Sequence, residues 1–117
     1  MKTKEALVAL AALAQETRLD VYRLLVREGE SGLAAGEIAA ALDVTPATLS
    51  FHLKELAHAG LIKARHEGRF IYYSADFAAM NALLDFLTDK CCGGDARACF
   101  PTRSAPTPEP VALRRRV

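Results

Sequence analysis

The sequence has no apolar run of the roughly 20 residues needed to span a bilayer, so we expect no membrane segment. It carries almost no net charge: 15 Lys and Arg against 14 Asp and Glu give +1, which is no global signature of nucleic-acid binding. Cysteine is scarce, and three cysteines do not fit a set of structural disulfides. The N-terminal lysines and apolar stretch resemble a signal peptide but run into an amphipathic pattern. We therefore expect a cytoplasmic protein with reduced thiols.

The composition fits one globular domain with a modest core, because 51% of the 117 residues are apolar and 25% are charged. Leu and Ala dominate, which favours helix. The second helix is expected to bury Leu19, Tyr22, Leu25 and Val26. Helical periodicity predicts five helices, over residues 3–14, 15–27, 34–42 and 46–58 and from a cap at Asp76 to Lys90.

The fourth predicted helix has clear start and stop signals. Thr45 is a good N-cap, Pro46 suits the first helical position, and Gly60 marks the end. The leucines at positions 49, 53 and 56 are spaced to face the core. A second face points away from the core, and its side chains are Ala47, Ser50, Phe51 and Lys54.

After Gly60 the pattern becomes β-prone, over residues 61–66 and 70–74, with the charged tip Glu67-Gly68-Arg69 between them. Two short helices joined by a tight turn and followed by a hairpin describe a winged helix-turn-helix. The expected fold is therefore mainly α with a β-hairpin, and of the winged helix-turn-helix type.

The segment from residue 44 to 74 is mildly basic, with four Lys and Arg against two Glu. A helix fits the major groove, where short polar side chains reach base edges and phosphates and an aromatic ring can touch a thymine methyl. His52 borders the core stripe, so packing and DNA contact are equally good interpretations. The predicted DNA contacts are Ala47, Thr48, Ser50, Phe51, His52 and Lys54 on the helix and Arg65 and Arg69 on the hairpin.

The segment TLSFHLKELAHAGLIKARHEGRFIYYS, residues 48–74, resembles the reading helix and wing of the ArsR/SmtB family of metal- and metalloid-responsive repressors. The family pattern is met by Ser50, His52, Leu53, Leu56, Ala59, Gly60 and Leu61, and in the wing by Gly68, Arg69, Phe70 and Tyr73. The resemblance covers about residues 5 to 92. It implies a homodimer through the first and last helices on double-stranded, pseudo-palindromic operator DNA.

All three cysteines lie in DKCCGGDARACF, as Cys91, Cys92 and Cys99. Adjacent cysteines rarely bond to each other, but they can bind one soft ion together. Three thiolates without a histidine suit trivalent arsenic or antimony, because structural zinc usually takes four ligands. The family's cysteine pair on the third helix and its carboxylate–histidine site on the last helix are both absent. The chain looks like the branch whose sensing cysteines follow the last helix.

The expected function is a repressor whose dimer leaves the operator when arsenite binds the three cysteines. One alternative is a repressor of the same fold that senses oxidation through a disulfide. Another is a repressor that senses methylarsenite or another methylated trivalent arsenical through two of the cysteines. The cysteines could also be incidental apolar residues. A thiol enzyme would need a base or a phosphate-binding loop near its nucleophilic cysteine, and the sequence shows neither, so we expect no enzymatic activity. A metal-carrying protein without DNA function would not need the reading helix or the wing. We expect one domain over residues 1–92 and a flexible segment over 93–117 that carries Cys99.

Overall fold

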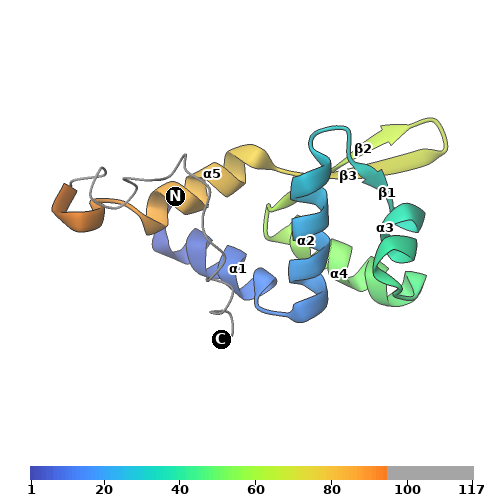
Figure 1. Ribbon diagram of the computed structural model, residues 1–117, viewed down its shortest axis with the longest axis horizontal. Coiled ribbons are helices and arrows are strands. Elements are labelled where there is room, and N and C mark those ends of the chain that lie inside the picture. The colour runs from blue at the N-terminus through green and yellow to red at the C-terminus, as the bar shows by residue number, and fades with distance from the viewer. Residues whose placement is uncertain (95–117) are drawn as a thin grey trace, which may run out of the picture. The chain divides into compact units, whose positions relative to one another are not determined.

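The computed structural model describes residues 1–94. Met1–Leu87 form one compact unit, and a second unit begins at Thr88. Figure 1 shows the small sheet at one end of the first unit, near α2 and α3, with α1 and α5 at the other end. In chain order the elements are α1 (Thr3–Leu13), α2 (Glu16–Glu28), β1 (Leu33–Ala34), α3 (Ala35–Leu42), α4 (Pro46–His58), β2 (Ile62–Glu67), β3 (Phe70–Ala75) and α5 (Phe77–Leu87). This order confirms the winged helix-turn-helix prediction.

The predicted helix boundaries hold where the sequence carries a local cap. The Thr45 hydroxyl accepts a hydrogen bond from the Thr48 N–H at 3.3 Å, and Pro46 takes the first position of α4. The Asp76 carboxylate accepts from the Ala79 N–H at 3.1 Å at the start of α5. Each cap satisfies a backbone donor that has no partner inside its helix.

The sheet has three antiparallel strands in the order β1-β3-β2. The hairpin of β2 and β3 was predicted, with Arg65 opposite Tyr72 and Glu67 opposite Phe70. The two-residue strand β1 was not, because two residues are too few to show a period. It pairs Leu33 with Tyr73 and so ties the start of α3 to the wing.

The core of the first unit is formed by side chains from α2, α3, α4 and the start of the hairpin. Its largest fully buried members are Val21, Leu25, Ile38, Leu49, Leu56 and Leu61. The prediction for α2 was wrong at Leu19, which is 42% exposed, because the buried stripe of this helix is centred on Val21 and Leu25. Leu19 lies about a third of a turn away from that stripe.

The last helix ends at Leu87, three residues before the predicted end at Lys90. Lys90 adopts a φ of 57°, which cannot continue a right-handed helix. In the second unit, Cys91–Gly94 form a tight turn in which Cys92 and Gly93 have positive φ angles of 55° and 69°. The expected division into a domain over residues 1–92 and a segment over residues 93–117 stays a prediction. Within residues 1–94, no helix has the length and apolar character required to cross a membrane.

Gly32 is required where the turn before β1 approaches β3. Its φ is 73°, and an added Cβ would lie 2.5 Å from the Tyr73 carbonyl oxygen. We expect Gly32→Ala to lower the free energy of unfolding by about 1–3 kcal/mol, measured by urea denaturation. Gly36→Ala is the matched control, because an added Cβ there meets nothing within 4 Å, and the expected change is within about 1 kcal/mol. Equal losses in both variants would contradict the close-approach argument.

Candidate nucleic-acid interface and cysteine segment

Helix α4 buries one face and exposes the other, as predicted. Leu49, Leu53 and Leu56 are buried, whereas Phe51 is 56% exposed. The exposed side chains of α4 include those of Ala47, Thr48, Ser50, Phe51 and Lys54. The Thr48 hydroxyl receives a hydrogen bond from the Thr45 hydroxyl at 2.9 Å, so its own proton is available to an acceptor outside the protein. This face presents donors and an apolar ring on a rigid helix.

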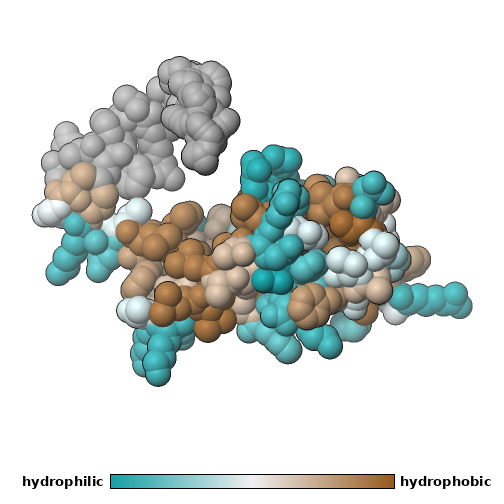
Figure 2. Space-filling view, turned by 90° about the horizontal axis from the view of Figure 1, so that it is seen from below, coloured by the Kyte–Doolittle hydropathy of each residue, from teal (hydrophilic) through white to brown (hydrophobic). Residues whose placement is uncertain are grey.

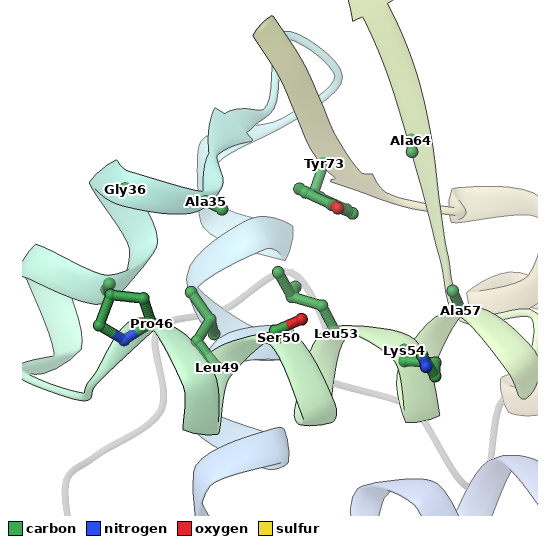
Figure 3. Close-up of a pocket in the computed structure, with 11 residues that line it drawn as sticks. Ala35, Gly36, Pro46, Leu49, Ser50, Leu53, Lys54, Ala57, Ala64 and Tyr73 are labelled. Carbon is green, nitrogen blue, oxygen red and sulfur yellow. The ribbon is translucent and has the colours of Figure 1, made fainter.

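A groove of about 390 Å³ separates α4 from the wing. Figure 3 shows Ala64 and Tyr73 of the wing on one side and Ser50, Leu53 and Lys54 of α4 on the other. The floor is mainly apolar, and Lys54 forms no ion pair with any residue from 1 to 94. Lys54 gives this groove its positive charge, and Ser50 adds a hydroxyl, both from α4.

His52 lies on α4 but points inward, with 8% of its surface exposed. Its Nδ1 lies 3.3 Å from Nη1 of Arg18 on α2, and Arg18 Nε donates to the Ala12 carbonyl in α1. The Phe51 ring meets the His52 ring at 5.3 Å in an edge-on arrangement. Of the two interpretations of His52, this geometry favours packing. The Arg18 partner is 34 residues away, so no local sequence pattern could have identified it.

The His52 environment favours the neutral ring. Burial lowers the pKa of His52, the Arg18 guanidinium lowers it further, and the Glu55 carboxylate opposes the shift. Because Nδ1 faces an N–H donor, it must be the unprotonated nitrogen, and Nε2 then carries the proton. Protonation would remove this acceptor and place a second positive charge beside Arg18.

The two predicted wing arginines lie in different surroundings. Arg69 is exposed at the hairpin tip and forms no ion pair with residues 1–94. Arg65 instead forms an ion pair with Glu67, and its Nε–Oε2 distance is 2.7 Å. It also donates to backbone carbonyls of the turn after α2. Arg69 is therefore available to DNA, whereas Arg65 already has partners inside the protein.

Two of the three predicted metalloid ligands lie in the described second unit, and Cys99 lies outside the described residues. The sulfur atoms of Cys91 and Cys92 are 3.7 Å apart, farther than the about 2.05 Å of a bond between them. Neither of these two cysteines is a free thiol within residues 1–94. Within residues 1–94, no three His, Cys, Asp or Glu side chains gather as a metal site.

Apolar side chains are exposed on α1 and α5, which contact each other. Leu7 and Val8 of α1 are 59% and 54% exposed, and Leu87 of α5 is 54% exposed. Figure 2 shows apolar side chains gathered over the side of the molecule on which α1 lies. Surface of this kind marks an interaction face.

The lowered pKa of His52 makes stability depend on pH in a defined direction. Well above about pH 6.5 the His52 ring is neutral in both the folded and unfolded states, so burial of the ring imposes no cost of losing a proton. As the pH falls below 6.5, the unfolded state takes up a proton before the folded state does, so the free energy of unfolding declines.

We expect the loss of stability between pH 7.5 and 5.5 to be smaller in His52→Gln than in the wild type, measured by urea denaturation at each pH. His66→Gln is the control, because His66 is exposed on β2. A pH dependence that is unchanged in His52→Gln would contradict the proposed role of the buried ring.

Comparison with known proteins agrees with this geometry. Residues 13–65 match the model of a family described as a helix-turn-helix domain. The transcriptional activator HlyU of Vibrio cholerae is 30% identical over 88 residues, which cover 75% of this chain and 79% of HlyU. The arsenical resistance operon repressor of Bacillus subtilis is 32% identical over 81 residues, which cover 69% of this chain and 73% of that protein.

Solved structures of similar proteins share the fold. An ArsR-like transcriptional regulator from Rhodococcus sp. RHA1 has a TM-score of 0.68 at 28% identity, and the match covers 90% of this chain and 96% of that one. The homodimeric winged helix-turn-helix DNA-binding domain of Mb0332 from Mycobacterium bovis has a TM-score of 0.59 at 33% identity, over 74% of this chain and 81% of that one. The chain therefore belongs to the ArsR/SmtB family of DNA-binding transcriptional regulators, and the resemblance of its reading helix and wing is confirmed.

Proposed function

We propose that this chain is a homodimeric repressor that binds operator DNA and is released when trivalent arsenic, or antimony, binds Cys91, Cys92 and Cys99. The observation that carries the DNA-binding half is the exposed face of α4, which is held on three buried leucines beside a wing with an exposed arginine. Repression is part of the proposal, because one similar protein is named a repressor and another an activator.

On the DNA, α4 would enter the major groove with its N-terminal half leading. Thr48 and Ser50 would donate to base edges or phosphates, Lys54 would contact a phosphate, and Phe51 would meet a thymine methyl. Ala47 would allow the close approach of the helix. Arg69 would reach the adjacent minor groove or backbone from the wing tip. His52 supports the helix from inside, so its predicted DNA contact is the least favoured of the set.

A dimer is needed because one winged helix reads too few base pairs for useful specificity. The exposed apolar side chains of α1 and α5 are the surface that a second copy would cover. A two-fold axis through that surface would present two copies of α4 to successive major grooves of a pseudo-palindromic site.

The cysteines carry the effector half of the proposal. In the reduced protein, Cys91 and Cys92 would supply two sulfur ligands to one soft ion, and Cys99 would supply the third. The sulfur atoms of Cys91 and Cys92 lie 3.7 Å apart. The name of the Bacillus subtilis relative, an arsenical resistance operon repressor, supports this choice of effector. For release, arsenic must bind the DNA-incompetent state more tightly, and a coupling free energy of about 1–3 kcal/mol suffices. By linkage, DNA lowers the affinity for arsenic by the same factor.

A redox-sensing repressor is the second candidate. Within residues 1–94 neither cysteine is a free thiol, which fits a segment that can also be oxidised. A sensor of methylated trivalent arsenicals would need only two of the three sulfurs. Both alternatives keep the DNA-binding part of the proposal and change only the signal.

The effector half is tested by fluorescence anisotropy of labelled DNA from the promoter upstream of the gene for this chain, with fully reduced protein. We expect arsenite to release the wild-type protein from DNA. The variants should bind DNA normally but need at least a tenfold higher arsenite concentration for release, and they are Cys91→Ser, Cys92→Ser and Cys99→Ser. A methylated trivalent arsenical is titrated in parallel. If only an oxidant releases the DNA, the redox candidate replaces the metalloid sensor.

The dimer face is tested by sedimentation of the DNA-free protein. Leu7→Glu places a charge in the exposed apolar surface of α1, so we expect the dimer dissociation constant to rise by at least tenfold. Ala40→Glu on the exposed side of α3 is the matched control and should leave the dimer intact. A wild-type monomer, or equal effects of the two substitutions, would contradict the assignment.

A further inference from the structure

We propose that Arg65 is a positioning residue that locks the wing in its DNA-binding orientation, and that the cation which the wing offers to DNA is Arg69. The inference rests on the proposed DNA-binding function and replaces the direct DNA contact predicted for Arg65. It is carried by four contacts that the Arg65 guanidinium makes inside the protein.

The guanidinium donates in three directions. Nε donates to Glu67 Oε2 at 2.7 Å, Nη2 to the Ser31 carbonyl at 3.1 Å, and Nη1 to the Glu30 carbonyl at 3.4 Å. The central carbon lies 5.2 Å from the centroid of the Tyr72 ring, within the range of a cation–π contact. Only a planar, forked group can make all of these contacts at once, so lysine cannot replace it.

The contacts cross the whole sheet. Arg65 lies on β2 opposite Tyr72 of β3, and Tyr72 lies opposite Ala34 of β1. The side chain therefore runs from β2, over the middle strand, to the turn that precedes β1. Since β2 pairs only with β3 within residues 1–94, Arg65 is a link between this edge strand and the far side of the sheet.

The turn that receives Arg65 is itself firmly held. It follows α2, whose Val21 and Leu25 are fully buried, and the Gly29 N–H bonds the Leu25 carbonyl at 3.2 Å. At its other end, Gly32 approaches the Tyr73 carbonyl so closely that no side chain fits. A wing fastened to this turn is fastened to the core of the reading unit.

Three of the five N–H donors of Arg65 are already used inside the protein, so at most two remain for a phosphate. Arg69 has no such partners among residues 1–94 and lies at the tip, beyond the last paired residues of the hairpin. A fixed wing sets the distance between Arg69 and α4. The lock would therefore determine the spacing between the contact at the wing and the contacts in the major groove.

The first test compares arginine and lysine at the two wing positions, by anisotropy with the same promoter DNA over a range of salt concentrations. We expect Arg65→Ala and Arg65→Lys to weaken binding alike, by about tenfold, with the salt slope unchanged. We expect Arg69→Lys to keep the salt dependence of the wild type, because lysine carries the same positive charge. Arg69→Ala should reduce the magnitude of the slope of log K against log salt concentration by about 1.8, because a dimer loses two phosphate contacts that contribute about 0.9 each.

A phosphate contact at Arg65 gives the opposite pattern, and that pattern would overturn the proposal. Arg65→Lys would then keep wild-type affinity, and Arg65→Ala would make the dependence of binding on salt concentration shallower.

The second test removes a negative charge near the DNA. If Arg65 contacts phosphate, Glu67→Ala frees it and reduces repulsion, so binding should tighten. If Arg65 is a lock, Glu67→Ala removes one of its anchors and binding should weaken by about three- to tenfold. Glu30→Ala is the matched control, because it removes the same charge while the backbone carbonyl that Arg65 uses remains.

Hydrogen exchange of the DNA-free protein tests the lock without DNA. Amides of residues 62–75 should exchange faster in Arg65→Ala and Glu67→Ala, but not in Glu30→Ala or Arg69→Ala, while amides of α2 and α4 stay protected. Unchanged exchange in Arg65→Ala would overturn the lock. If the wild type binds no DNA, the proposed function fails, and the exchange result still decides whether Arg65 holds the wing.

Discussion

The burial of one face of α4 is the constraint on which the rest of the structure depends. Leu49, Leu53 and Leu56 fix this helix to the core, and their spacing forces Phe51 and Lys54 to the outside. A helix must have its outer face free to enter a groove of DNA, yet its position must be set to within a fraction of an ångström for base readout. The buried leucines meet both demands, since they provide the attachment without using the reading face.

Apolar burial alone does not fix the direction of a helix or hairpin, and two arginines supply that direction. Arg18 connects the Ala12 carbonyl of α1 to His52 of α4, so it joins the helix that exposes the apolar face to the helix that would read DNA. Arg65 connects the wing to the turn after α2. Hydrogen bonds depend strongly on angle, whereas hydrophobic contact does not, and this makes each arginine a geometric restraint.

The parts of the fold that could be predicted are those encoded by neighbouring residues. Thr45, Pro46 and Gly60 bound α4 because caps and stops act within a few positions of the chain. Arg18, which contacts His52, and the Ser31 carbonyl, which accepts from Arg65, each lie 34 residues from their partner and carry no local signal. Leu19 was misplaced because an apolar residue near the edge of a stripe satisfies the same period as one inside it. The end of α5 was misplaced because Lys90, a good helix former, adopts a left-handed conformation.

The rigidity of the reading unit determines how an effector can act on it. The wing, α3 and α4 share fully buried core residues and belong to one compact unit, and close-packed interiors do not deform continuously. A ligand at Cys91 and Cys92, which follow α5 in the chain, would gain little by bending this unit. A change in how two copies meet would instead alter the separation of their reading helices at small cost, since such interfaces have discrete alternative packings. We therefore expect release from DNA to occur through the dimer geometry, with the internal structure of each reading unit preserved.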